Sequence, residues 1–185
     1  MNMDFQDFLG KRILIVGEVG SGKTRLLARF IDFLVEVGLE SETTLIDLAP
    51  GHGDIGRLTE EYTGNVYRVR YLKPDRIFPP RTLGRSRDEV LEYARRNQEA
   101  ARRLFKKFLE EPTRILLVND LTIYLHYGEI DDVLKLMGSA ETFTATAYEG
   151  VILSDDKGSG ISVRERKLLD RLKREVDLVL SLSKS

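Results

Sequence analysis

The chain has 185 residues, 42% of them hydrophobic, which predicts one domain with a sizeable core. Its net charge of -1 gives no overall attraction to nucleic acid or an anionic membrane, although local basic patches remain possible, and the absence of cysteine excludes disulfides, a thiolate nucleophile and cysteine-based zinc sites. Because the chain has no basic segment leading into an apolar signal core and no run of about 18 apolar residues, we expect a cytoplasmic protein without membrane insertion.

Apolar runs alternate with helical patterns through the first half of the chain. RILIV (12–16) predicts a buried strand, and the apolar residues after it recur at helical spacing up to Gly38. TTLIDL (43–48) and VYRVRYL (66–72) predict the second and third strands. KPDRIFPPRTLGR (73–85) contains three prolines and four basic residues, which predicts a loop.

A long helix is predicted after this loop. Ser86 and Glu89 have capping-box spacing, and one apolar face continues down to Pro112. RILLVND (114–120) predicts the fourth strand, whereas residues 121–147 fit either one helix or two.

The last part of the chain predicts two further strands around a helix. VILS (151–154) is expected to be the fifth strand and DLVLSL (177–182) the sixth, and Ser162 and Glu165 have the spacing of a capping box between them. Strands separated by helices favour a mostly parallel sheet covered on both faces, which is a three-layer α/β/α fold formed by residues 1–185 as one domain.

The segment GEVGSGKT (17–24) matches the phosphate-loop pattern G-x-x-x-x-G-K-[ST] between a strand and a helix. Its glycines let backbone N–H groups surround a phosphate at the positive end of the helix. Lys23 is expected to reach the β- and γ-phosphates, and the Thr24 hydroxyl to bind Mg²⁺. The alternative is a glycine-rich turn without a ligand. The predicted nucleotide contacts are Gly17, Gly20, Ser21, Gly22, Lys23, Thr24 and Arg25.

An acidic residue is expected to hold the magnesium from a neighbouring strand. Asp120 ends the apolar run ILLVND, where an α/β sheet binds its ligands. The alternative is an aspartate that caps the following helix. Residue 121 is leucine, so the Asp-Glu pair of many vigorous ATPases is absent.

On these motifs the chain resembles the P-loop NTPases, and the resemblance implies binding of a nucleoside triphosphate and Mg²⁺ at Gly17 to Thr24 and Asp120. SDDKGSG (154–160) does not match the guanine-specific loop of the Ras-like branch, so ATP is favoured. The order of elements resembles RecA-like and KaiC-like ATPases, which usually place a catalytic glutamate after the third strand. Asp75 stands there instead, and turnover is expected to be slow unless the carboxylate lies elsewhere.

A second polar segment, LIDLAPGHGDIG (45–56), follows the second predicted strand. It resembles a segment of P-loop polynucleotide kinases, in which Asp47 matches the first acid while His52 and Ala49 replace a glutamine and the second acid. Two interpretations of this segment stay open. In one, Pro50, Gly51 and Gly53 form a tight turn and Asp54 caps the next segment. In the other, Asp47 or Asp54 aligns water or an acceptor hydroxyl.

Positive charge lies in two places. The loop 73–85 is a possible lid whose Arg76, Arg81 or Arg85 neutralises charge in the transition state. The long helix carries basic residues that could meet nucleic acid, although interspersed glutamates favour a solvated face. His126, beside two tyrosines, is expected to be a packed ring rather than a ligand.

The sequence therefore predicts a protein that binds Mg²⁺ and ATP and hydrolyses ATP slowly with coupled loop movement, with Lys23, Asp47 and Asp120 as catalytic residues. Two alternatives stay open. One is a phosphotransferase related to polynucleotide kinases, and the other is a module that binds ATP without hydrolysis and then docks a protein partner.

Overall fold

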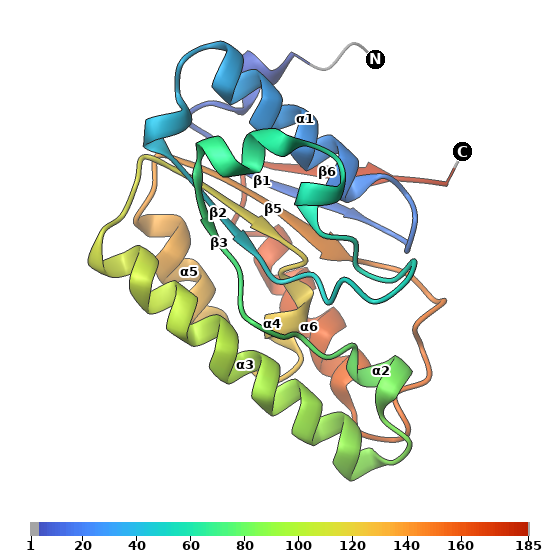
Figure 1. Ribbon diagram of the computed structural model, residues 1–185. Helices are drawn as coiled ribbons and strands as arrows, with labels where there is room; N and C mark the ends of the chain where they lie inside the picture. The colour runs from blue at the N-terminus through green and yellow to red at the C-terminus, as the bar shows by residue number, and fades with distance from the viewer. Residues whose placement is uncertain (1–3, 185) are drawn as a thin grey trace.

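A computed structural model describes residues 4–184. Its centre is a six-stranded sheet with the strand order β3-β2-β4-β5-β1-β6 (Figure 1). Every neighbouring pair of strands is parallel. The strands are β1 (Arg12–Gly17), β2 (Thr43–Asp47), β3 (Arg70–Leu72), β4 (Ile115–Asn119), β5 (Thr142–Tyr148) and β6 (Leu178–Leu182).

Helices cover both faces of this sheet, as a parallel sheet requires. Figure 1 shows α1 (Lys23–Glu36) on one face and the remaining long helices on the other. Two clusters of buried apolar side chains fill the two interfaces. The fold is therefore the predicted three-layer α/β/α arrangement. The other helices are α2 (Pro80–Leu83), α3 (Arg87–Glu110), α4 (Thr122–Leu125), α5 (Ile130–Gly138) and α6 (Ile161–Lys173), and short 3₁₀ helices lie at Phe5–Phe8, Glu40–Glu42, Thr59–Glu61 and Gly64–Arg68.

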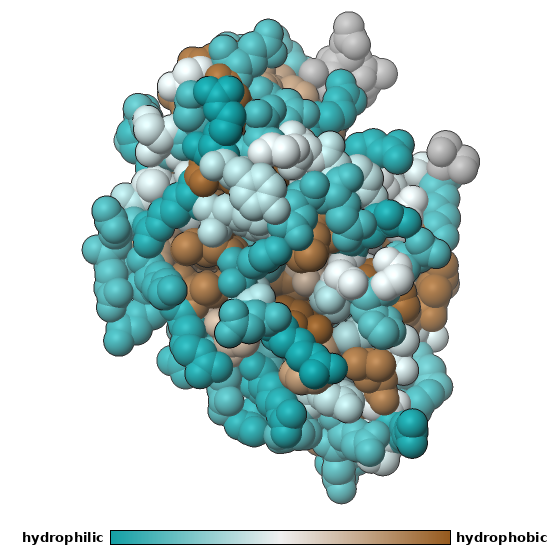
Figure 2. Space-filling model, in the orientation of Figure 1, coloured by the Kyte–Doolittle hydropathy of each residue, from teal (hydrophilic) through white to brown (hydrophobic). Residues whose placement is uncertain are grey.

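The cap and the two faces of the long helix α3 match the pattern that predicted it from the sequence. Ser86 caps its N-terminus by accepting a hydrogen bond from the Glu89 N–H at 3.2 Å. Its apolar face is buried from Val90 to Phe108. Its outer face is hydrophilic over most of its length in Figure 2.

Ion pairs on α3 and beside it neutralise much of the basic surface that the sequence suggested for nucleic acid. The Arg95 guanidinium contacts the carboxylates of Glu92 and Glu99 at 2.9 and 2.5 Å, and Arg96 contacts Glu92 at 2.8 Å. Charges of both signs therefore alternate along this face, which fits a solvated surface.

The fifth strand is not VILS (151–154), and this prediction is wrong. Residues 142–148 form β5 between β4 and β1, and Val151 and Ile152 lie in an exposed turn. The sequence TFTATAY alternates threonine with phenylalanine or alanine. These small and β-branched side chains fit a strand buried on both faces, but they lack the continuous large apolar residues that identified the other strands.

Three further predictions need correction. Residues 64–68 form a 3₁₀ helix, so the third strand is only Arg70–Leu72. Residues 121–147 contain α4, α5 and β5 rather than helix alone. Ser162 does not cap α6, because the helix begins at Ile161 after the left-handed Gly160 and Ser162 lies within its first turn.

The segment 73–85 is mostly irregular, as predicted, and is anchored to α3. The buried side chain of Asn97 accepts a hydrogen bond from the Phe78 N–H at 2.9 Å and donates one to the Phe78 carbonyl at 2.7 Å. This pair satisfies the backbone of a loop residue that has no strand partner. Among residues 4–184, no helix is long and apolar enough to cross a membrane.

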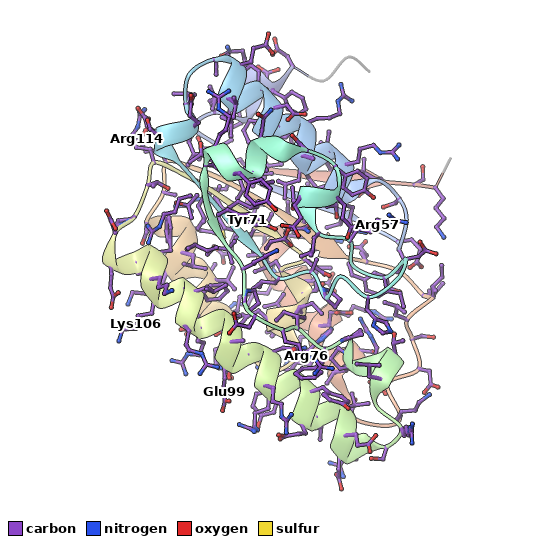
Figure 3. The ribbon with its side chains drawn as sticks, in the orientation of Figure 1. Arg57, Tyr71, Arg76, Glu99, Lys106 and Arg114 are labelled. Carbon is purple, nitrogen blue, oxygen red and sulfur yellow. The ribbon has the colours of Figure 1, made fainter. Side chains whose placement is uncertain are left out.

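Replacing Phe108 with alanine should lower the free energy of unfolding by about 3–5 kcal/mol, because the side chain is fully buried between α3 and the sheet. Urea denaturation measures the change. Lys106→Ala is the matched control on the same helix, since this side chain is 79% exposed and points away from the sheet (Figure 3). Equal unfolding midpoints for the two variants would contradict the packing of α3.

Candidate functional site

The segment between β1 and α1 has the backbone geometry that its glycines predict. Gly20 and Gly22 have φ angles of 75° and 91°, which residues with a Cβ rarely adopt. A Cβ on Gly17 would lie 2.4 Å from the Leu182 carbonyl oxygen on the neighbouring strand β6. The chain can therefore leave β1 beside β6 and curl into the first turn of α1 only with glycine at these positions.

This curl leaves a group of hydrogen-bond donors without partners. Within residues 4–184, these backbone N–H groups donate to no acceptor, and they belong to Gly20, Gly22, Lys23, Thr24 and Arg25. The buried Ser21 hydroxyl also has no partner among these residues. Free N–H groups at a helix N-terminus carry partial positive charge and bind anions. The loop therefore fits the oxygen atoms of a phosphate group.

Lys23 lies across the same loop. Its ammonium group donates hydrogen bonds to the carbonyl oxygens of Gly17 at 2.8 Å and Glu18 at 2.7 Å. Burial lowers the pKa of Lys23, while the carboxylates of Asp120 and Glu18 act in the opposite direction. The ammonium group is thus held at the loop, close enough to Asp120 for the two charges to interact.

A cleft opens beside the loop 17–24 at the C-terminal ends of the strands. Gly20, Gly22, Lys23 and Thr24 line it on one side, and Pro50, residues 54–57 and residues 79–82 contribute further walls.

Asp120 projects into this cleft from the residue after β4. Its backbone has a φ angle of 59°, and its N–H donates to the Thr146 hydroxyl of β5 at 2.8 Å. Burial raises the pKa of Asp120 to about 6, and nearby Glu165 adds to this effect while Lys23 opposes it. The carboxyl group is thus in the cleft that also contains Lys23 and Thr24.

The side chain that contacts Thr24 is Asn119, which our sequence analysis did not identify. The Thr24 hydroxyl donates to Asn119 Oδ1 at 3.2 Å, and the Thr146 hydroxyl donates to the same oxygen at 2.8 Å. Asn119 Nδ2 donates to Asp47 Oδ1 at 2.9 Å and to the Arg57 carbonyl at 3.2 Å. The polar group beside Thr24 is therefore a neutral amide, and Asp120 lies one residue further on.

Asp47, at the end of β2, lies beneath this network with no exposed surface. Its carboxylate accepts hydrogen bonds from the Thr59 N–H at 2.7 Å, the Ala49 N–H at 3.2 Å and Asn119, and Tyr71 donates to it at 3.4 Å. Burial raises its pKa, although the hydrogen bonds act in the opposite direction. Asp47 is not part of the cleft wall, and its catalytic role stays a prediction.

The arginines of the segment 73–85 lie in different environments. The Arg81 side chain is 6% exposed, contacts the Glu165 carboxylate at 3.0 and 3.2 Å and lies over the Tyr148 ring. Arg76 lies over the Phe78 ring at 4.5 Å and close to α3 (Figure 3). The backbone N–H of the exposed Arg85 donates to Glu89. Only Arg81 reaches the cleft.

The residues around Thr24 offer the ligands that magnesium prefers, namely a hydroxyl oxygen and the Asp120 carboxylate. Among residues 4–184, no three histidine, aspartate or glutamate side chains gather to hold a metal ion. Magnesium in nucleotide sites needs only one or two protein ligands, because phosphates and water supply the rest. The donor set therefore fits magnesium bound together with a phosphate, but not a metal held by protein alone.

No family model matches the chain, and no curated protein matches it. Two solved structures are similar to it at 15% sequence identity. One is a protein from Pyrococcus horikoshii OT3, with 98% of this chain and 88% of the other covered at a TM-score of 0.39. The other is an ATPase from the type III secretion system of pathogenic bacteria, with 95% of this chain but 52% of the ATPase covered at a TM-score of 0.40. Likenesses this distant establish neither a family nor a function.

Asp47→Asn should lower the free energy of unfolding by at least about 2 kcal/mol, because the buried asparagine would turn an amide donor toward groups that donate to Asp47. Thermal and urea denaturation measure the loss. The control in the following segment is Asp54→Asn, whose side chain is 94% exposed and should change stability little. A fully stable Asp47→Asn protein would show that the carboxylate does not organise this network.

Proposed function

We propose that the protein binds Mg²⁺ and ATP at the phosphate loop and hydrolyses ATP slowly. The observation that carries the proposal is the group of unpaired donors at the N-terminus of α1, formed by the N–H groups of Gly20, Gly22 and Lys23–Arg25. These donors and the Lys23 ammonium match the charge and spacing of a polyphosphate chain. The all-parallel sheet with helices on both faces also fits a nucleotide-binding fold.

The loop and the polar side chains beside it have separate roles in this proposal. The loop amides bind the β-phosphate, and Lys23 leaves the carbonyls of Gly17 and Glu18 to contact the β- and γ-phosphates. The Thr24 hydroxyl and the Asp120 carboxylate hold magnesium, which neutralises phosphate charge when bound. Asn119 keeps the Thr24 side chain in place through its contact at 3.2 Å.

Slow turnover follows from the shortage of carboxylates in the cleft. Asp54 and Asp120 are the acidic residues of its described wall, and Asp54 is exposed and paired with Arg57 at 2.8 Å. If Asp120 binds magnesium, no second carboxylate is placed to orient the attacking water. Residue 121 is leucine and is fully buried. Water attack therefore lacks the base that fast ATPases use.

Lys23→Ala should weaken ATP binding at least about 100-fold without unfolding the protein, since the ammonium would contact phosphate and its two hydrogen bonds are to the carbonyls of Gly17 and Glu18 rather than to the apolar core. Isothermal titration with ATP and with GTP measures affinity and base preference, and circular dichroism checks the fold. Lys11→Ala, an exposed lysine just before β1, is the control. Unchanged affinity in a folded Lys23→Ala protein would disprove the phosphate-loop assignment.

Asp120→Asn should leave binding of magnesium-free ATP nearly unchanged and remove most of the gain in affinity that Mg²⁺ produces, because an amide is a poorer ligand for this cation. ATP titrations with Mg²⁺ and with EDTA give this difference directly. Asp54→Asn serves as the control carboxylate of the same cleft. An equal magnesium effect in Asp120→Asn and the parent protein would assign the acidic ligand to another residue.

A further inference from the structure

The cleft extends well beyond the phosphate loop. Its far part, which is the part away from this loop, is lined by apolar and aromatic side chains from four segments of the chain. These residues are Pro79, Pro80, Ile123, Tyr148 and Leu153. Rings and aliphatic carbon atoms of this kind pack against the apolar face of a small organic molecule.

A buried carboxylate and a histidine meet at this end of the cleft. His126 is 2% exposed, and its Nε2 lies 2.5 Å from Glu165 Oε2. The ring forms part of the cleft wall, while His126 Nδ1 has no hydrogen-bond partner among residues 4–184. A buried polar atom without a partner is rare in folded proteins. A ligand atom bound at this place would supply the hydrogen bond that Nδ1 lacks.

The environment of Glu165 determines what His126 Nδ1 can do. The Glu165 carboxylate is buried and is held between Arg81 and His126. Arg81 holds both carboxylate oxygens, at 3.0 and 3.2 Å. With Nε2 as the donor to this carboxylate at 2.5 Å, Nδ1 is the nitrogen of the ring that carries a lone pair and has no partner. This nitrogen belongs to a ring of the cleft wall.

The charged residues of the cleft indicate what kind of molecule this end of it would bind. Arg81 is paired with Glu165, and Arg57 is paired with Asp54 and Glu61. Lys23 belongs to the phosphate loop. Within the described cleft wall no further cation is left for a second anionic group. An uncharged molecule therefore fits this end better than a phosphorylated molecule or the end of a nucleic acid.

We propose that the far part of the cleft binds an uncharged hydroxyl compound with an apolar face, such as a sugar or a nucleoside, and that His126 accepts its hydroxyl proton during phosphoryl transfer. The acceptor oxygen forms a bond to the γ-phosphorus as the bond to the bridging oxygen of ATP breaks. ADP leaves with that electron pair, and the hydroxyl proton moves to His126 Nδ1. The proposal rests on ATP binding at the phosphate loop, and slow hydrolysis is then what remains when water replaces the acceptor.

The test measures ADP release from ATP with a panel of acceptors, together with mass spectrometry of the products. The panel contains free sugars and nucleosides, their monophosphates and a short oligonucleotide with a 5′-hydroxyl. At least one uncharged member should raise ADP release about tenfold or more over water and appear in phosphorylated form. If ATP binds but no uncharged member is phosphorylated, or if the charged members react faster, the inference is overturned. If ATP does not bind, the proposed function itself fails.

His126→Asn should then lower acceptor-dependent turnover about 100-fold or more, with ATP affinity unchanged within about twofold. His52→Asn, which changes the other histidine of the chain at an exposed position, should keep parental turnover. Added imidazole should restore part of the activity of His126→Ala, which a purely structural role would not allow. Parental acceptor turnover in His126→Asn would remove His126 from the reaction.

Glu165→Gln provides an independent test should the His126 variants fold poorly. The amide keeps the shape of the side chain but removes its charge, so Glu165 acts here as a positioning residue for His126. Acceptor-dependent turnover should fall while the KM for ATP stays close to the parental value. If turnover falls and the KM for ATP rises by a similar factor, the effect is structural alone, which would contradict the proposed pair.

Discussion

The Asn119 side chain joins four parts of the structure, and the geometry of the cleft depends on it. Its oxygen accepts hydrogen bonds from Thr24 of α1 and Thr146 of β5, and its nitrogen donates to Asp47 of β2 and to the segment 50–57. A side-chain amide supplies an acceptor oxygen and a donor nitrogen at once. An aspartate here would face Asp47 as a second buried carboxylate, which is unfavourable unless one of them is protonated.

A neutral side chain beside Thr24 leaves Asp120 as the acidic group of the proposed phosphate site. The left-handed backbone at Asp120, with a φ angle of 59°, turns its carboxyl group into the cleft. Such a conformation is uncommon for a residue other than glycine and is tolerated best by aspartate and asparagine. The ionised form of Asp120 is favoured by Lys23, whose own charge Asp120 stabilises in return. The two residues therefore form one electrostatic unit although 97 positions separate them.

The parts of the structure that could be predicted from the sequence depend on neighbours along the chain. The strand β1, the glycine-rich loop and α1 follow from an apolar run, a local backbone requirement and helical spacing. The strand β5 was missed because its threonines and alanines fit the space between β4 and β1, which the sequence of the segment itself does not reveal. Glu165 has capping-box spacing after Ser162, but its partner Arg81 is 84 residues away. Contacts between residues so far apart in the chain leave no periodic pattern in the sequence.

The buried pair of Arg81 and Glu165 also limits how a lid at residues 73–85 could move. The segment is anchored at Phe78 through the buried Asn97 and at Arg81 through a bidentate ion pair. Separating a buried pair without replacing a partner costs about 3–5 kcal/mol. Opening of this segment therefore carries this cost unless a ligand that contacts Glu165 or His126 compensates for it. Because such a ligand would occupy the far part of the cleft, loop movement would depend on the acceptor more than on ATP.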